Sequence, residues 1–189
     1  MVISEKALVQ GMKNAFKAGG YNVICRNGER TVIMCPSWAV EIDNDNMPRE
    51  VLSLLALHMG YLPESGDACK ILKADKEATV QTMLFEDAMI TIRKSLELPL
   101  GSGGTPRVTV KKTTLTLDGY NVWQKTGNQG IVLVAPEHER ILRKREDAAV
   151  AGRALYKEGE ASRAWIFCYE DARLESQLNH LGQILWVAK

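Results

Sequence analysis

The fold of this chain follows from YNVICRNGERTVIMC, residues 21–35. Two runs rich in β-branched and apolar residues, 21–25 and 31–35, lie on either side of the pair Asn27-Gly28. Asparagine and glycine both tolerate the positive φ angles of a type I′ turn, so this pair between two such runs is a strong hairpin signal. The sequence therefore predicts an antiparallel β-hairpin over these residues.

Helices and further strands are predicted around this hairpin. Before it, Ser4 is a suitable N-cap, and apolar residues from Leu8 to Phe16 recur at helical spacing. The segment 78–83 fits a strand but also the start of the next helix. In all, the N-terminal part is predicted to form a helix at 4–17, a second helix from a cap at Asp45 or Asn46 to Gly60, a third helix at 85–96, and strands at 38–42, 68–73 and 78–83.

A glycine-rich stretch, residues 101–106, is the one low-complexity segment and falls near the middle of the chain. Its composition is that of a flexible connector, so it predicts a division into residues 1–100 and 107–189, which pack as one domain or as two. The predicted fold class is α+β, with mostly antiparallel strands packed against helices. Beyond the connector we expect strands on either side of Lys111-Lys112, a hairpin at 120–125 and 130–135, a long helix at 137–158, a strand at 164–169, a short helix at 170–181 and a strand at 184–187.

The two predicted hairpins resemble each other in sequence. GYNV at 20–23 recurs at 119–122, and each copy is followed by a turn glycine and then by a strand that ends in proline, VIMCP at 32–36 and VLVAP at 132–136. This order and spacing favour an internal duplication of two halves, each a β-hairpin packed on a helix. Convergence is the alternative, because any hairpin favours such residues and because the elements that flank the two hairpins differ.

Composition and charge limit the classes of function. The 189 residues are 46% hydrophobic and 25% charged, which is ordinary for a globular protein. Lysine and arginine number 24 against 23 aspartate and glutamate residues, so there is no general basic excess for nucleic acid. The sequence has neither a signal-peptide pattern nor an apolar run of about eighteen residues, which predicts a cytoplasmic protein that does not enter a membrane. The cysteines form no CxxC pair and are expected to be free thiols: Cys25, Cys35, Cys69 and Cys168.

His58 is the candidate catalytic residue. It shares a helix face with Val51, Leu54 and Leu55, where a histidine that opens into a cleft would serve as a general base. The alternative, which the sequence favours, is a structural histidine that donates a hydrogen bond to a carbonyl of its own helix. Gly60 supports this alternative because it places His58 in the last helical turn.

Arg140, Arg143, Lys144 and Arg145 form the main basic cluster. On the predicted helix at 137–158 they would make a weak nucleic-acid site. The sequence favours a solvated helix face instead, because acidic side chains such as Glu139 lie one turn from the arginines and neutralise them.

Other motifs lack a part that their chemistry needs. Glu137-His138-Glu139 has no second histidine at the spacing of a zinc site, and the acidic run 43–46 lacks the glycine and the glutamate of a calcium loop. Cys35 has no neighbouring cation to lower its pKa, and the segment 101–105 lacks the lysine of a phosphate loop. The sequence therefore predicts no cofactor and no metal.

These observations lead to three hypotheses about function. The first is a non-catalytic binding or accessory protein of the cytoplasm, whose partner is another protein or a second copy of the chain. The second is a small hydrolase-like enzyme that uses His58 with a carboxylate or a cysteine from a distant part of the sequence. The third, nucleic-acid binding through the helix at 137–158, is the least favoured because the overall charge is balanced.

Overall fold

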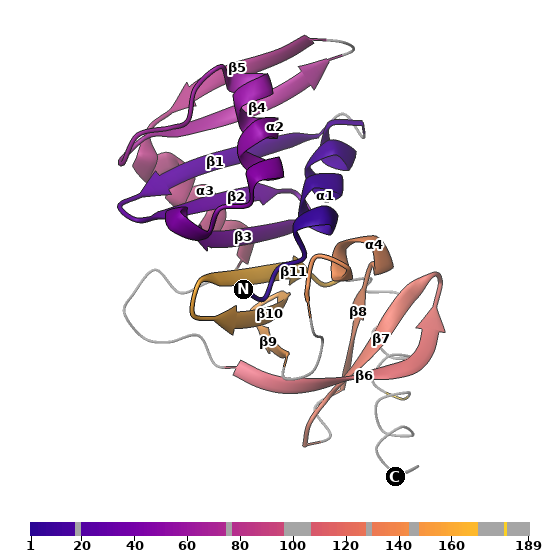
Figure 1. Ribbon diagram of the computed structural model, residues 1–189. Helices are drawn as coiled ribbons and strands as arrows, with labels where there is room; N and C mark the ends of the chain where they lie inside the picture. The colour runs from indigo at the N-terminus through magenta and orange to yellow at the C-terminus, as the bar shows by residue number, and fades with distance from the viewer. Residues whose placement is uncertain are drawn as a thin grey trace.

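The structure, a computed structural model, describes residues 1–17, 20–74, 77–96, 107–127, 130–143, 148–169 and 180. The described residues form a mixed α+β fold, as predicted, in which helices pack on an antiparallel sheet (Figure 1). Within this part of the chain the sheet has eleven strands in the order β5-β4-β1-β2-β3-β11-β10-β9-β6-β7-β8.

The N-terminal part follows the sequence prediction closely. Residues 44–46 form a separate 3-10 turn, and Pro48 is the N-cap of the second helix, so this helix begins later than predicted. The segment 78–83 is a strand, which settles the open alternative. The elements are α1 (Glu5–Lys17), β1 (Tyr21–Asn27), β2 (Arg30–Cys35), β3 (Trp38–Asp43), η1 (Asn44–Asn46), α2 (Arg49–Met59), β4 (Ala68–Ala74), β5 (Glu77–Met83) and α3 (Phe85–Leu96).

The first hairpin is confirmed, but its turn lies one residue beyond the predicted position. Asn27 pairs with Arg30, so the two turn residues are Gly28 and Glu29. Gly28 has a φ of 57°, whereas Asn27 and Glu29 do not have positive φ angles. A turn with a positive φ at its first position alone needs one glycine, and the type I′ turn predicted at Asn27-Gly28 is therefore wrong.

The C-terminal part differs more from the prediction. The hairpin at 120–125 and 130–135 is confirmed, but the two strands expected around Lys111-Lys112 are one long strand with an irregularity between Lys112 and Thr116. The elements are β6 (Arg107–Leu117), β7 (Tyr120–Lys125), β8 (Ile131–Val134), α4 (Pro136–Glu139), β9 (Ala149–Ala151), β10 (Ala154–Gly159) and β11 (Ser162–Phe167).

The long helix predicted at 137–158 is wrong. The helix α4 ends at Glu139, and a turn at Gly152 and Arg153 joins β9 to β10. The apolar residues of this segment fit a helical period, but β9 and β10 are strands because they pair with strands from distant parts of the sequence. The partners of β9 are β6 and β10, and β10 also pairs with β11.

The two parts of the chain share one continuous sheet. β11 pairs with β3, from Ser162 opposite Ile42 to Ile166 opposite Trp38. The predicted division into residues 1–100 and 107–189 stays a prediction. The connector at 101–106 and the elements predicted at 170–181 and 184–187 lie outside the described residues, apart from the helical residue His180.

The structure does not confirm an internal duplication. β1 pairs with β2 and with the later strand β4, whereas β7 pairs with β8 and with the earlier strand β6. The registers also differ by one residue. Val23 lies opposite Met34, but Val122 lies opposite Leu133 and not opposite Val134, the residue that corresponds to Met34 in the sequence alignment.

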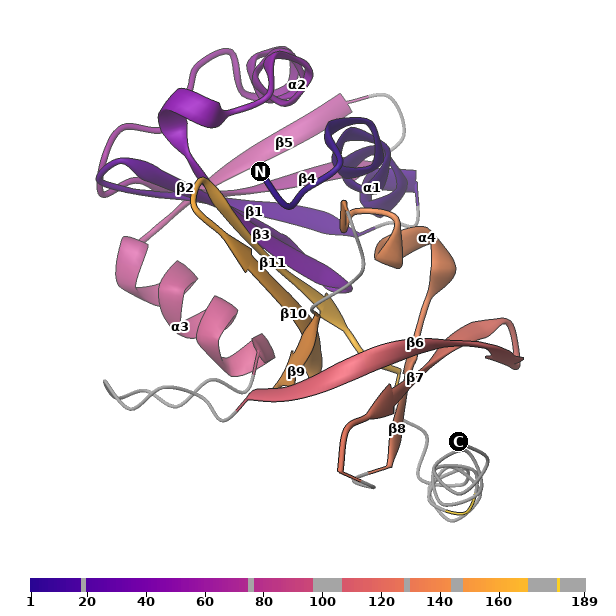
Figure 2. The ribbon, with the colours of Figure 1, turned by 60° about the horizontal axis from the view of Figure 1, so that its bottom comes forward.

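Alternate side chains of the strands build the two larger cores, which lie on opposite faces of the sheet. Ile24 and Ile33 pack with α1 and α2 on one face, and Val23 and Met34 pack with α3 on the other. Figure 2 shows α1, α2 and α4 on one side of the sheet and α3 on the opposite side. The outer surfaces of α1 and α2 carry exposed side chains, such as Lys13 and Leu57. No helix in the described part of the chain is long and apolar enough to span a membrane.

Candidate binding sites beside helix α2

His58 lies in the last turn of α2, as predicted, and its side chain is half-buried. Its ring meets the ring of Phe16 edge-on, with 4.9 Å between the ring centroids, so His58 helps to join α2 to α1. Two cavities flank α2, and His58 is not among the described residues that line them. The contact with Phe16 fits a structural role, which stays a prediction.

The basic cluster is only partly described. Arg140 and Arg143 are exposed, and Lys144 and Arg145 lie outside the described residues. Arg143 follows the end of α4, and its backbone N–H donates to the carbonyl of Val2. Because the helix at 137–158 does not exist, it cannot present these side chains to a groove of nucleic acid.

Glu139 is fully buried, which the prediction of a solvated helix face did not anticipate. Its carboxylate accepts hydrogen bonds from Lys112 Nζ at 2.7 Å and from the side chains of Asn121 and Trp123. These donors already occupy the carboxylate oxygens, so the group stabilises the fold.

Burial lowers the pKa of the neighbouring His138. In the part of the chain that the structure describes, no three His, Cys, Asp or Glu side chains gather as metal ligands.

The cysteines are poor candidates for a nucleophile. Cys25, Cys35 and Cys69 are buried, and burial raises the pKa of each thiol to about 11. At neutral pH such thiols are protonated, whereas catalysis requires the thiolate. Backbone hydrogen bonds lower the pKa of Cys35 by less than burial raises it.

A groove runs between α1 and α2, and we call it the α1–α2 groove. Its volume is about 320 Å³. Val9 and Leu54 are largely buried and form its floor, whereas 77% of the surface of Leu57 is exposed. Leu57 and the two floor residues line the same groove, and a groove with an apolar lining is a common site for protein ligands. The described lining residues are Val9, Lys13, Glu50, Ser53, Leu54 and Leu57.

One lysine of α1, Lys13, lines this groove, and two more lysines share its face of the helix. Lys6, Lys13 and Lys17 are exposed, and at about 100° per residue they fall within a sector of about 40° on the helix. Val9 lies next to this sector, about 40° from Lys13. Lys13 and Glu50 are the charged residues among the described lining residues and balance each other, so the positive excess on this face of α1 comes from Lys6 and Lys17.

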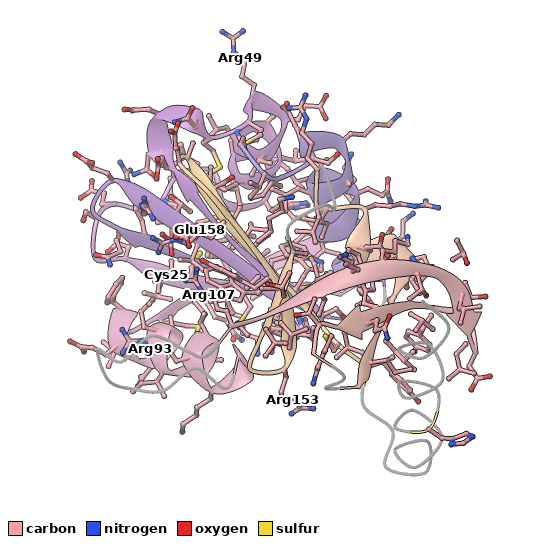
Figure 3. The ribbon with its side chains drawn as sticks, turned by 90° about the horizontal axis from the view of Figure 1, so that it is seen from below. Cys25, Arg49, Arg93, Arg107, Arg153 and Glu158 are labelled. Atoms are coloured by element: carbon pink, nitrogen blue, oxygen red, sulfur yellow. The ribbon has the colours of Figure 1, made fainter. Side chains whose placement is uncertain are left out.

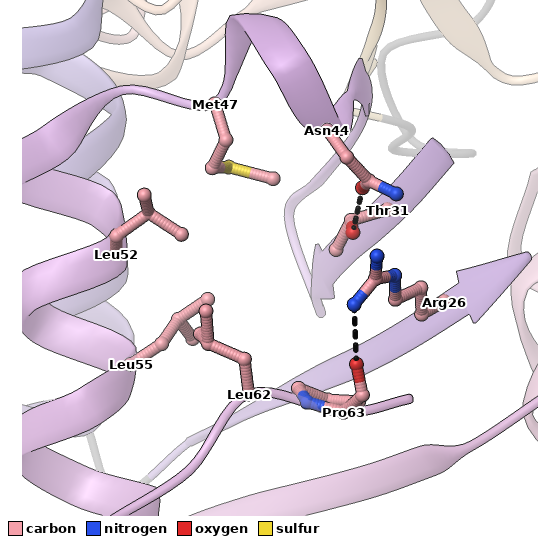
Figure 4. Close-up of a pocket in the computed structure, with 8 residues that line it drawn as sticks. All are labelled: Arg26, Thr31, Asn44, Met47, Leu52, Leu55, Leu62 and Pro63. Carbon is pink, nitrogen blue, oxygen red and sulfur yellow. Dashed lines mark hydrogen bonds between the residues drawn. The ribbon is translucent and has the colours of Figure 1, made fainter. Parts of the chain in front are cut away.

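A second cavity, of about 200 Å³, lies on the other side of α2 (Figure 4). We call it the Arg26 pocket. Figure 4 shows the guanidinium group of Arg26 on one side of the pocket and aliphatic side chains from α2 on the other. The described lining residues are Arg26, Thr31, Asn44, Met47, Leu52, Leu55, Leu62 and Pro63.

Arg26 has unused hydrogen-bonding capacity. Its Nη1 donates to the carbonyl of Pro63 at 3.1 Å, while its Nε is buried and has no acceptor. No carboxylate of the described residues lies within salt-bridge distance of Arg26. A half-buried guanidinium group without an anionic partner is unusual, since charged groups that leave water are normally paired.

Comparisons with known proteins add no functional information. No protein-family model matches the chain, and neither the curated proteins nor the solved structures gave a match. The candidate sites therefore rest on the geometry alone.

Sequence reasoning missed both sites. The lysine spacing on α1 is visible in the sequence, whereas the contact between Arg26 and Pro63 joins residues 37 positions apart.

Proposed function

We propose that this protein is a non-catalytic binding protein that holds an acidic amphipathic helix of a partner protein in the α1–α2 groove. The observation that carries this proposal is the exposure of Leu57, 77% of its surface, beside a floor of Val9 and Leu54. An amphipathic helix that lays its apolar face into such a groove is a common mode of protein recognition.

Charge supports an acidic partner. Lys6, Lys13 and Lys17 form one stripe along α1, and Lys13 of this stripe lines the groove together with one acid, Glu50. Glutamate or aspartate on the flank of a bound helix would face this stripe, which speeds association and selects against basic helices.

Two other occupants fit less well. A second copy of the chain in a symmetric contact would place one lysine stripe near the other, and these like charges would repel. A membrane surface attracts basic amphipathic helices whose apolar face is free to insert. Here the apolar face of α1, with Leu8, Met12 and Phe16, is buried in the core.

The test uses a designed peptide as the probe, a fluorescein-labelled helix with leucines at i, i+3, i+4 and i+7 and glutamates elsewhere. The matched probe carries lysine in place of each glutamate. We expect the acidic peptide to bind with a Kd on the order of 10 µM by fluorescence anisotropy, and the basic peptide to bind at least about tenfold more weakly.

Variants of the protein locate the binding. Leu57→Ser removes the apolar anchor and should weaken the acidic peptide at least about tenfold, because truncating a central anchor typically costs more than about 1 kcal/mol. Leu115→Ser on β6 is the matched control, since Leu115 is 42% exposed and belongs to a strand away from α1 and α2 (Figure 1). Both variants should keep their folding stability within about 0.5 kcal/mol, as surface substitutions usually do.

Three results would overturn the proposal: equal binding of the acidic and basic peptides, no binding of either, or equal effects of Leu57→Ser and Leu115→Ser. Binding to vesicles of anionic lipid without binding to the acidic peptide would assign this face to a membrane. Dimerisation that Leu57→Ser abolishes, measured by sedimentation, would assign it to a second copy of the chain.

A further inference from the structure

We propose that the Arg26 pocket is a second binding site, which takes a small ligand that combines one carboxylate with one apolar group. The pocket lies on the side of α2 that faces β1 and β2, whereas the α1–α2 groove lies on its other side. The two sites share no described lining residue, so the two proposals can fail separately.

Arg26 is the group that would hold the carboxylate. A guanidinium group carries five N–H donors in a planar fork that matches a carboxylate in geometry and charge. Within the described residues, its side chain makes one hydrogen bond, from Nη1 to the carbonyl of Pro63. This bond fixes the guanidinium group at the pocket wall and leaves further donors for a ligand.

Asp67, which adjoins Arg26 in the fold, does not neutralise its guanidinium group. The backbone N–H of Arg26 donates to the backbone carbonyl of Asp67, while the carboxylate of Asp67 accepts from the backbone N–H of Glu64 at 3.0 Å. The acid that adjoins Arg26 in the fold is therefore engaged with its own loop. Within the described part of the chain no carboxylate forms an ion pair with this guanidinium group, so a ligand carboxylate would not have to displace one.

The neighbouring polar side chains are already satisfied, so they would not compete for the ligand. The hydroxyl of Thr31 donates to Asn44 Oδ1 at 2.6 Å, and Asn44 Nδ2 donates to the carbonyl of Gly28 at 3.1 Å. Figure 4 shows Thr31 and Asn44 joined in this way above Arg26. Arg26 is thus the group that sets the charge of the ligand.

The rest of the pocket sets the size and polarity of the ligand. Its aliphatic wall consists of Met47, Leu52, Leu55, Leu62 and Pro63. At about 200 Å³ the pocket is smaller than the roughly 300–1,000 Å³ of sites for whole drug-sized molecules, so it suits one side-chain-sized group. A branched short-chain carboxylic acid and the C-terminal leucine of a peptide both present this chemistry.

A matched pair of small molecules tests the proposal. N-acetylleucine and N-acetylleucinamide differ in the carboxylate alone, and their binding can be followed by the backbone NMR shifts of Thr31, Asn44 and Leu62. We expect N-acetylleucine to bind with a Kd on the order of 1 mM, the affinity that about twelve non-hydrogen atoms reach at ordinary ligand efficiency. The amide should bind at least about tenfold more weakly.

Two variants and one control assign the binding to this pocket. Arg26→Gln removes the cation, and Leu62→Glu places a carboxylate next to it at a position that is 43% exposed and therefore tolerant. Each should weaken N-acetylleucine at least about tenfold. The control is Arg49→Gln, which makes the same change in charge at a side chain that points into solvent (Figure 3).

The outcomes decide between the sources of the carboxylate. Binding of 3-methylbutanoate as tight as that of N-acetylleucine assigns the pocket to free carboxylic acids, and tighter binding of N-acetylleucine assigns it to peptide C-termini. Equal binding of the acid and the amide overturns the proposal, as does unchanged binding to Leu62→Glu. The Leu62→Glu result stands even where Arg26→Gln fails to fold.

Discussion

Nη1 of Arg163 in β11 lies 3.5 Å from Oε1 of Glu41 in β3, and this ion pair crosses the seam where the two parts of the chain join into one sheet. The same guanidinium group donates through Nε to Glu158 of β10 at 2.7 Å. Arg30 of β2 continues the row on one side through Glu41, and Arg107 of β6 continues it on the other through Glu158. Figure 3 shows Arg107 and Glu158 near each other. The row thus links five strands, which include β2 and β3 from the N-terminal part.

Arg163→Gln should lower the free energy of unfolding by about 0.5–1 kcal/mol, because Arg163 bridges two carboxylates but is 37% exposed. The loss should shrink at high salt, since solvent ions screen exposed pairs. Urea unfolding of the variant and the native protein at low and high salt measures both effects. Lys111→Gln, an exposed lysine on β6, is the control for a lost charge. A loss equal to that of the control would show that the row adds no stability.

Tyr156→Phe tests how the phenol of Tyr156 makes the stability of the protein depend on alkaline pH. Burial and, to a smaller extent, the hydrogen bond to Glu158 raise the pKa of Tyr156 to about 12. A raised pKa favours the neutral phenol in the folded state, so its contribution to stability is complete below pH 10 and is lost as pH rises towards 12. At neutral pH the variant should be about 1 kcal/mol less stable, because it lacks the hydrogen bond.

Above pH 10 the difference between Tyr156→Phe and the native protein should shrink, since the native protein alone carries the phenol with a raised pKa. Urea unfolding at neutral pH and near pH 11 measures this change. The difference absorbance of ionised tyrosine between the two proteins gives the pKa directly. A pKa near 10 in that difference spectrum would contradict the prediction.

The N-terminal elements could be predicted from the sequence because their signals are local. The stripe from Leu8 to Phe16 packs on the sheet as the spacing indicates, and the hairpin forms around Gly28. The turn moved by one residue because a glycine alone satisfies its positive φ, and Asn27 then pairs within the ladder.

The segment after α4 could not be predicted from periodicity. β9 has three residues, too few to show alternation, and it is a strand because β6 and β10 flank it. Gly152, with a φ of 58°, was the missed local signal, since it begins the two-residue turn of a hairpin.

Sequence reasoning about the site chose His58 because histidine is the side chain that titrates near neutral pH. The features that define the two cavities depend instead on tertiary contacts. The exposure of Leu57 depends on what covers α2, and the Arg26 pocket requires the loop at Pro63 to return to β1. Neither is encoded in a short motif.

The thiols should react in two classes. Cys25, Cys35 and Cys69 are buried and their pKa values are raised to about 11, whereas Cys168 is half-buried. A disulfide reagent near pH 8 should therefore modify at most one thiol rapidly in the native protein and all four cysteines after denaturation. Cys25 and Cys69 do not pair, because they belong to cores on opposite faces of the sheet. Fewer than four thiols in the denatured protein would contradict this prediction.

The buried carboxylate of Glu139 should be among the most sensitive positions in the C-terminal part. It ties α4 to β6 through Lys112 and to β7 through Asn121 and Trp123. Glu139→Ala leaves these donors without their acceptor and should lower the free energy of unfolding by about 3 kcal/mol. Glu139→Gln keeps the shape and one acceptor oxygen, so its cost should be about half as large.

Lys112→Met tests the same cluster from the other side. It removes the cation and leaves a fully buried carboxylate with the neutral donors of Asn121 and Trp123, which should cost about 3–5 kcal/mol. The double variant Glu139→Gln with Lys112→Met no longer contains a buried charge. Its cost should therefore be at least about 1 kcal/mol smaller than the sum of the two single costs. Urea unfolding of the three variants gives this coupling energy, and purely additive costs would show that Lys112 and Glu139 do not act as a pair.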